Sequence, residues 1–168
     1  AQYYPIERPR TFCTSGRLGT MGYGMGAAIG AAKATGKHVI LVTGDGCFNM
    51  NLNELSTAVT QGLPITVLLM NNHALGMVRQ WQKLFYGRRF SQTDVRKKTD
   101  YVKFAESFGA KGLRIANKDD IVPVLREAFA TPSPVVVDCM IGNDENVLPM
   151  IKPGQTYDTI MTEWEEKQ

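Results

Sequence analysis

The chain contains two apolar runs, each of which ends in a short polar motif. Residues 38–43 read His-Val-Ile-Leu-Val-Thr and lead into Gly-Asp-Gly at 44–46, whereas residues 64–70 read Pro-Ile-Thr-Val-Leu-Leu-Met and lead into Asn71-Asn72. Each run has the length and β-branched content of a strand buried on both of its faces. The pattern predicts two strands whose polar motifs lie at their carboxyl ends, where open α/β sheets bind ligands.

Helical and extended patterns alternate along the rest of the chain. Their alternation predicts a doubly wound α/β fold, with a mostly parallel sheet and helices on both faces. We expect a single domain over residues 1–168, with an entry arm at about 1–15, a core at about 16–141 and a C-terminal tail at about 142–168. Predicted helices cover residues 18–35, about 49–61, 75–86, 101–108 and 118–129, and further strands cover 113–116 and 134–141.

Composition argues against several classes of function. The net charge of +3 is the small difference between 19 basic and 16 acidic residues, and the short basic runs at 88–89 and 96–98 are expected to be solvated faces rather than a nucleic-acid site. Three widely spaced cysteines (Cys13, Cys47 and Cys139) and two histidines indicate neither a disulfide framework nor a zinc site. A reducing, cytoplasmic compartment is therefore the default expectation.

The sequence shows no pattern expected of a targeting signal or a membrane span. There is no signal-peptide pattern at the start and no apolar stretch long enough to span a membrane. Residues 1–5 enter without a helix cap or strand signal, so we expect them to be a cut end inside a longer polypeptide.

The polar motifs indicate a metal-diphosphate site. Asp45 offers a carboxylate, Asn72 an amide oxygen, and the turn after Asn72 a main-chain carbonyl, which together suit Mg²⁺ completed by phosphate oxygens. Gly44 and Gly46 are expected to adopt positive φ and let the backbone approach a ligand. A helix beginning at about Asn49 would turn its free N–H groups toward an anion.

The spacing of the motifs resembles a known signature. Gly-Asp-Gly, about two dozen residues and then Asn-Asn resembles the signature of thiamine-diphosphate enzymes. Further segments follow the order seen in acetohydroxyacid (acetolactate) synthase catalytic subunits, including Arg10-Thr11-Phe12, 19–24, 76–82, 84–86 and 147–150. The resemblance covers about residues 3–154, but only the C-terminal, diphosphate-binding third of such an enzyme.

The resemblance implies specific roles for residues of this chain. Met21 would lie under the cofactor, and Cys47 would act through its N–H rather than as a nucleophile. The implied metal ligands are Asp45, Asn72 and the main chain of Ala74. The implied substrate-pocket residues are Val78 and Trp81. The implied cofactor-binding residues are Gly19, Met21, Asp45, Gly46, Cys47, Asn72, Ala74, Leu75, Gly76 and Met77.

The resemblance also implies domains of the family that no residue of this sequence matches. The family's activating glutamate lies in an N-terminal pyrimidine-binding domain and its FAD lies on a middle domain, so we expect no catalytic residue here and no turnover by this domain alone. The implied reaction condenses pyruvate with a second 2-ketoacid, such as 2-ketobutyrate, after decarboxylation, in branched-chain amino-acid biosynthesis. The implied partners are further copies of the chain, with the cofactor at a subunit interface, and a possible regulatory subunit.

Other interpretations remain open at this point. The chain could come from a sister carboligase or decarboxylase of the same superfamily, or be a non-catalytic module that binds a nucleotide or diphosphate. Gly22 to Ala27 also fits a loose dinucleotide-binding fingerprint, although no good strand precedes it. Met21 and Trp81 could be core residues. Arg17 and Gly26 depart from the family pattern, where Gly and Pro are usual.

Overall fold

The computed structural model describes residues 3–95 and 99–163, so the basic run at 96–98 lies outside the described residues. Contacts divide the described chain into two units, one of residues 3–71 and 99–141 and one of residues 72–95 and 142–163. The first unit contains, in order, α1 (Tyr23–Thr35), β1 (Val39–Gly44), α2 (Asp45–Phe48), the 3₁₀ turn η1 (Leu52–Glu54), α3 (Leu55–Thr60), β2 (Ile65–Asn71), α5 (Tyr101–Ser107), β3 (Lys111–Ile115), η2 (Lys118–Asp120), α6 (Ile121–Ala130) and β4 (Val135–Met140). The second contains α4 (Gly76–Phe85) and η3 (Tyr157–Thr159).

The sheet of the first unit has four strands in the order β1-β2-β4-β3, and every pair is parallel. In the register of β1 and β2, Val39 lies across from Ile65 and Gly44 lies across from Met70. The predicted α/β fold with a parallel sheet is therefore confirmed.

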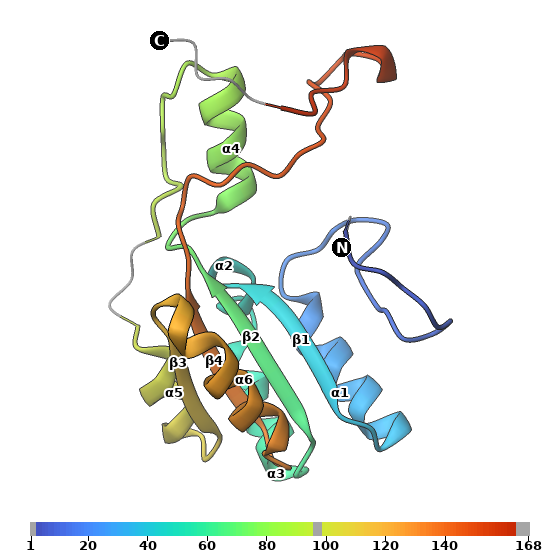
Figure 1. Ribbon diagram of the computed structural model, residues 1–168, viewed down its shortest axis with the longest axis vertical. Helices are drawn as coiled ribbons and strands as arrows, with labels where there is room; N and C mark the ends of the chain where they lie inside the picture. Colours follow the sequence, from blue (N-terminus) through green and yellow to red (C-terminus); the bar gives the residue numbers. More distant parts are fainter. Residues whose placement is uncertain (1–2, 96–98, 164–168) are drawn as a thin grey trace. The chain divides into compact units, whose positions relative to one another are not determined.

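Helices cover both faces of this sheet (Figure 1). The packing of α1, α3 and α5 forms the larger apolar core on one face, whereas α6 packs on the other face over β3 and β4. Alternate residues of β2 and β4 enter the two cores, as the two-residue period of a strand requires. The larger core contains Phe48, Leu55, Ile65, Val67, Leu69 and Val136, and the smaller contains Ile115, Ala128, Val135 and Val137.

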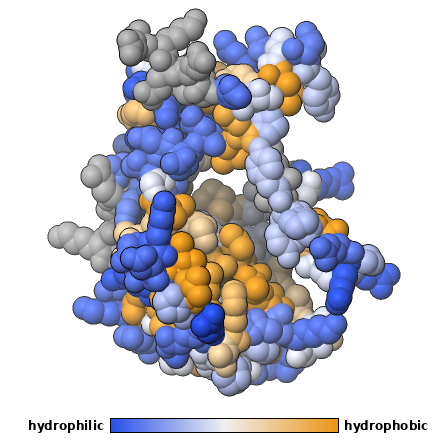
Figure 2. All heavy atoms as spheres, viewed as in Figure 1, coloured by the Kyte–Doolittle hydropathy of each residue, from blue (hydrophilic) through white to orange (hydrophobic). Residues whose placement is uncertain are grey.

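The prediction that both leading strands are buried on two faces is confirmed for β2 and wrong for β1. The odd-numbered residues of β2, on one face, are all buried, and on the other face Thr66 is buried while Leu68 and Met70 are partly buried and pack on the smaller core. In β1, by contrast, Ile40 is 51% and Val42 is 64% exposed. β1 is an edge strand, and α6, on the same face of the sheet as Ile40 and Val42, packs mainly on β3 and β4, which leaves these two side chains of β1 exposed. Apolar residues are accordingly visible on this face in Figure 2.

The helix boundaries near the two polar motifs also differ from prediction. α1 begins at Tyr23 rather than near residue 18, after Gly22 at a φ of 85°. No helix begins at Asn49, because α2 starts at once after β1 and lasts four residues before η1 and α3. The expected positive φ is wrong for both glycines of the first motif, since Gly44 is extended with a φ of −85° and Gly46 lies inside α2.

In the second unit, α4 confirms the helix expected at 75–86 and is joined to the tail by polar contacts. The buried carboxamide of Gln80 donates to the Val147 carbonyl at 2.9 Å and accepts from the Val147 N–H at 2.7 Å. Arg79 forms an ion pair with Asp144 at 3.0 Å. These contacts hold the tail, although it has little regular structure, along the helix.

We predict that Gly112→Ala destabilises the fold. A Cβ at Gly112 would lie 2.5 Å from the main-chain oxygen of Val102 and 2.9 Å from its Cα, so α5 would have to move away from β3. The expected loss in the free energy of unfolding is about 1–3 kcal/mol, measured by urea denaturation. Gly30→Ala, inside α1, is the matched control, because nothing lies within 4 Å of a Cβ at that position. It should raise the free energy of unfolding by about 0.5–1 kcal/mol. Equal effects of the two variants would contradict the close packing of α5 on β3.

Candidate metal-diphosphate site

Two of the motif residues leave the sheet at the same edge. Gly44 ends β1 across from Met70, so Asp45 follows β1 at the level where Asn71 ends β2. Both side chains are almost completely buried, with 3% of Asp45 and 2% of Asn71 exposed. A buried carboxylate and a buried amide therefore begin at neighbouring carboxyl ends, as the sequence predicts.

Asn72 and Ala74 form a tight turn in the second unit. The Asn72 Oδ1 accepts a hydrogen bond from the Ala74 N–H at 3.0 Å, and His73 between them has a φ of 55°. A Cβ at Gly76 would lie 2.9 Å from the Asn72 Nδ2, so the glycine makes room for this side chain at the start of α4. This asparagine-capped turn fixes the amide of Asn72 relative to the main chain of Ala74.

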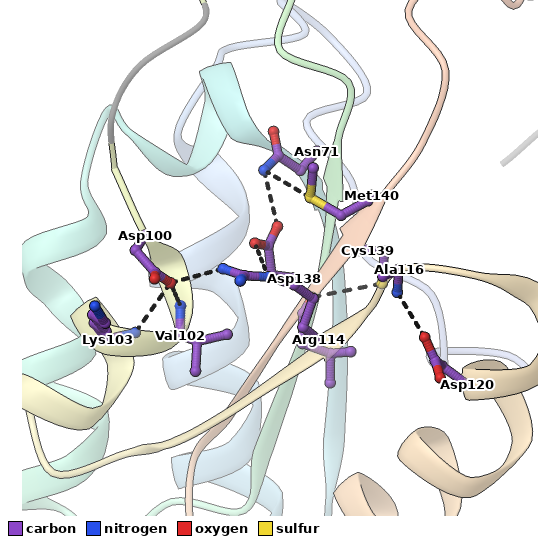
Figure 3. A network of polar contacts seen from close by, with 11 residues as sticks. Asn71, Asp100, Val102, Lys103, Arg114, Ala116, Asp120, Asp138, Cys139 and Met140 are labelled. Carbon is purple, nitrogen blue, oxygen red and sulfur yellow. Dashed lines mark hydrogen bonds and ion pairs between the residues drawn. The ribbon is translucent and has the colours of Figure 1, made fainter.

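Asn71 is held by a buried carboxylate that the motif analysis did not include. Its Nδ2 donates to Asp138 Oδ1 at 2.9 Å and approaches the Met140 sulfur at 3.7 Å (Figure 3). Asp138 lies in β4 and is 2% exposed. Because a carboxylate and a thioether offer only acceptors, the amide nitrogen of Asn71 must face them.

Arg114 supplies the charge that a buried Asp138 requires. Its Nε donates to Asp138 Oδ2 at 3.1 Å and its terminal nitrogen donates to Asp100 Oδ1 at 2.7 Å. Partial burial by itself would raise the pKa of the Asp100 carboxyl, but the Lys103 N–H and the Arg114 guanidinium outweigh it and hold that pKa below its ordinary value. This cluster lies at the carboxyl ends of the strands that form the larger core.

Tyr101 connects this cluster with the first motif. Burial raises the pKa of the Tyr101 phenol, and the negative charges of Asp45 and Asp138 raise it further. Its hydroxyl accepts a hydrogen bond from Asn49 at 2.9 Å. Two buried acids therefore act on one buried hydroxyl, which makes this edge of the sheet suited to a cation.

The glycine-rich loop before α1 is tied to the segment after α2. Asn51 Nδ2 donates to the Gly22 carbonyl at 2.7 Å, and a Cβ at Gly22 would lie 2.8 Å from that of Met50. The loop contains Gly19, at a φ of 60°, and Met21, whose side chain is 40% exposed. Met21 is thus not a core residue, so its expected contact with a ligand remains a prediction.

Val78 and Trp81 lie on one side of α4 and line a pocket of about 450 Å³ together with Gln82, Tyr86 and Arg89. Trp81 is 37% exposed and packs edge-to-face on Phe85, with ring centroids 5.9 Å apart. The interpretation of Trp81 as a core residue is therefore wrong, whereas its contact with a substrate stays a prediction.

The oxygen atoms of Asp45, Asn72 and Ala74 suit a hard cation that carries a diphosphate better than they suit a soft metal. Among residues 3–95 and 99–163, no group of three or more His, Cys, Asp or Glu side chains could hold a metal ion, so a cation here would need amide and main-chain oxygens. α2 is too short to offer a helix dipole, and Gly46 and Cys47 within it would contribute N–H groups only. Burial raises the pKa of the Cys139 thiol to about 11, which keeps that cysteine protonated.

Three residues around the site, Asp138, Arg114 and Asn51, are not predicted from the sequence. A signal for Asp138 is present in the sequence, because an acidic residue interrupts the apolar run at 134–141. Arg114 and Asn51 each stand between two apolar residues, as a solvent-facing polar residue also would, so neither stands out in the sequence. The pairing of β4 with β2 and β3 shows the surroundings of Asp138 and Arg114, and the contact with the Gly22 loop shows the partner of Asn51.

The described part of the chain contains no helix that is long and apolar enough to cross a membrane.

Comparisons with known proteins point to one family. Residues 1–139 match the model described as thiamine pyrophosphate enzyme, C-terminal TPP binding domain. The chain is 46% identical over 166 residues to the acetolactate synthase large subunit of Mycobacterium tuberculosis, covering 95% of this chain and 27% of that protein. It is 43% identical over 159 residues to the mitochondrial acetolactate synthase catalytic subunit of Saccharomyces cerevisiae, covering 94% of this chain and 23% of that protein. The chain thus spans about a quarter of these relatives' length.

A solved structure shares the fold. The thiamine diphosphate-dependent 4-hydroxybenzoylformate decarboxylase of Rhodococcus jostii superposes with a TM-score of 0.69 and 28% sequence identity, over 75% of this chain and 24% of that one.

We predict that Arg114→Met destabilises the first unit, because Asp138 would keep a buried charge with only the Asn71 amide beside it. The expected loss is about 2 kcal/mol at neutral pH, measured by urea denaturation. Arg114 also pairs with Asp100, whose folded pKa lies below its unfolded value near 4. The stability that the Arg114–Asp100 pair contributes is therefore fully present above about pH 4 and is lost as the pH falls through the folded pKa. The acid-induced loss of stability should therefore be smaller in the variant. Arg126→Met, at an exposed position of α6, should change stability by less than about 0.5 kcal/mol; a similar loss there would contradict the role of Arg114.

Proposed function

This chain belongs to the thiamine pyrophosphate enzyme family through its C-terminal TPP-binding domain, and on that premise we propose that it binds the Mg²⁺-diphosphate end of thiamine diphosphate in an acetolactate synthase. The observation that carries the proposal is the placement of buried Asp45 and Asn71 at neighbouring carboxyl ends of β1 and β2. Acidic and amide oxygens at such ends suit Mg²⁺, and through the cation they hold phosphate oxygens. The similarity to acetolactate synthases favours this activity over that of a sister decarboxylase.

We assign the metal ligands to three oxygens of this chain. Asp45 contributes the carboxylate, Asn72 its Oδ1 and Ala74 its main-chain carbonyl. The Asn72 turn supports this assignment, since the hydrogen bond from the Ala74 N–H leaves the second lone pair of that oxygen for a cation. Gly46, Cys47, Leu75, Gly76 and Met77 would place main-chain groups around the diphosphate, and Gly19 and Met21 would meet the rings of the cofactor.

The cofactor, when bound, supplies a nucleophilic carbon for the decarboxylation of 2-ketoacids, whereas the protein binds and orients it. Val78 and Trp81 would present an apolar wall to the second 2-ketoacid, which is supported by the pocket that they line on α4. Apolar walls of this kind discriminate between substrates that differ by one methylene, as pyruvate and 2-ketobutyrate do.

The remaining partners belong to the proposal as well. The substrates are pyruvate and 2-ketobutyrate, FAD binds a middle domain of the complete enzyme, and an activating glutamate comes from an N-terminal domain of another subunit. The assembly is a homo-oligomer, to which a regulatory subunit could bind. A cytoplasmic location is part of this proposal, although the yeast relative is named as mitochondrial.

We predict that Asp45→Ala abolishes Mg²⁺-dependent binding of thiamine diphosphate, because the protein carboxylate at the cation is lost. Isothermal titration calorimetry of the purified chain with thiamine diphosphate, with and without Mg²⁺, measures this. Asp119→Ala removes an exposed carboxylate from η2 and should leave the affinity within about twofold. Unchanged affinity in Asp45→Ala would remove Asp45 from the site. A preference of the wild-type chain for ADP over thiamine diphosphate would instead favour a regulatory nucleotide-binding module.

We predict that the chain by itself forms no acetolactate. Pyruvate, thiamine diphosphate and Mg²⁺ are mixed with the purified chain, and acetolactate is measured by its conversion to acetoin. The expected absence of product follows from the proposed dependence on a glutamate of another domain. Turnover above that of a mixture without protein would refute this dependence.

A further inference from the structure

One oxygen at the proposed site has no hydrogen-bond partner among residues 3–95 and 99–163. Among the described residues, the Oδ1 atoms of Asn51 and Asn71 are the buried side-chain oxygen or nitrogen atoms without a hydrogen-bond partner. Asn51 is only partly buried, whereas Asn71 is 98% buried. Leaving a buried acceptor without a donor is unfavourable, so native proteins do this rarely and mostly where a ligand or water completes the bond.

The direction of this oxygen is set by the chain. Asp138 and the Met140 sulfur both face the Asn71 nitrogen, so the amide cannot turn over without placing its oxygen against a carboxylate. In Figure 3 the oxygen of Asn71 accordingly lies on the side of the amide away from Asp138. Arg114 keeps Asp138 in place through the bond from its Nε. The ion pair therefore orients the amide although it makes no contact with Asn71 Oδ1.

The position of the oxygen indicates its donor. Asn71 ends β2 one residue before Asn72 and beside the level at which Asp45 follows β1. Mg²⁺ is octahedral and commonly keeps water in addition to its protein and phosphate ligands. A water bound to Mg²⁺ is a strong hydrogen-bond donor, and in a buried site it needs an acceptor nearby.

We propose that Asn71 is a positioning residue for Mg²⁺, and that its Oδ1, turned outward by Asp138, accepts a hydrogen bond from a water molecule on the cation. This inference rests on the proposed function and adds the Asn71–Asp138–Arg114 chain to the metal site. It divides the work of the two asparagines, since Asn72 binds the cation directly and Asn71 holds one of its waters.

The test measures the affinity for Mg²⁺ of the purified chain at saturating thiamine diphosphate, by isothermal titration calorimetry. Asn71→Leu keeps the branching of the side chain and removes the oxygen together with the amide nitrogen, and it should weaken Mg²⁺ binding by about tenfold or more. The affinity for thiamine diphosphate in EDTA should stay within about twofold of the wild-type value, which a merely structural defect would not spare. Thermal unfolding without ligand confirms that each variant is folded.

Asp138→Asn is the second variant and retains the Asn71 side chain. The amide introduced at position 138 can donate to Asn71 Oδ1 and draw it inward, so Mg²⁺ affinity should fall here as well. If Asn71→Leu does not fold, this variant decides the question, and a wild-type affinity in it overturns the proposal.

Thr66→Val is the matched control, because Thr66 is fully buried in the same strand at its other end and binds His38. It should lower stability and leave Mg²⁺ affinity within about twofold. Wild-type Mg²⁺ affinity in a folded Asn71→Leu overturns the inference while leaving the proposed function intact. A wild-type chain whose binding of thiamine diphosphate does not depend on Mg²⁺ overturns both.

Discussion

Parallel pairing of β1 with β2 is the constraint on which the candidate site depends. The two strands run in register from Val39 and Ile65 to Gly44 and Met70, so both polar motifs leave the sheet at one edge. An antiparallel arrangement would place the same motifs at opposite ends of the sheet. The helical segments between the strands make the parallel arrangement possible, because a parallel pair needs a long crossover connection.

The buried polar layer at that edge follows from the same register. Pairing of β4 with β2 places Asp138 across from Leu69, two residues before Met140 meets Asn71, and pairing with β3 places Arg114 across from Asp138. An aspartate at this depth requires a compensating charge and hydrogen bonds, and it receives both from two different strands. The apolar core and the polar layer are therefore built from the same strands, and the polar layer lies nearer to the carboxyl ends of these strands.

The parts of the fold that sequence predicted well are those with strong local patterns. β2, β4, α4 and α5 appear within a few residues of the predicted limits, since a continuous β-branched run or a helical spacing of apolar residues decides each of them. The errors at β1 and near Asn49 have a different origin. An edge strand and a central strand have the same apolar composition. The helix expected at about 49–61 is replaced by η1 and α3, which follow the separate short helix α2, whose Phe48 packs against Tyr101 and Phe104 far along the chain.

The sequence by itself determined the class of the fold, the two motifs and the resemblance to thiamine-diphosphate enzymes, because each of these depends on residue types at short spacing. Tertiary structure alone decided which side of β1 is covered and which residues surround Asn71. Asp138 lies far along the chain from both Asn71 and Arg114, and only strand pairing brings it within hydrogen-bonding distance of each. Hydrogen bonds act over about 3 Å, so a residue's partners are a property of the assembled sheet rather than of the local sequence.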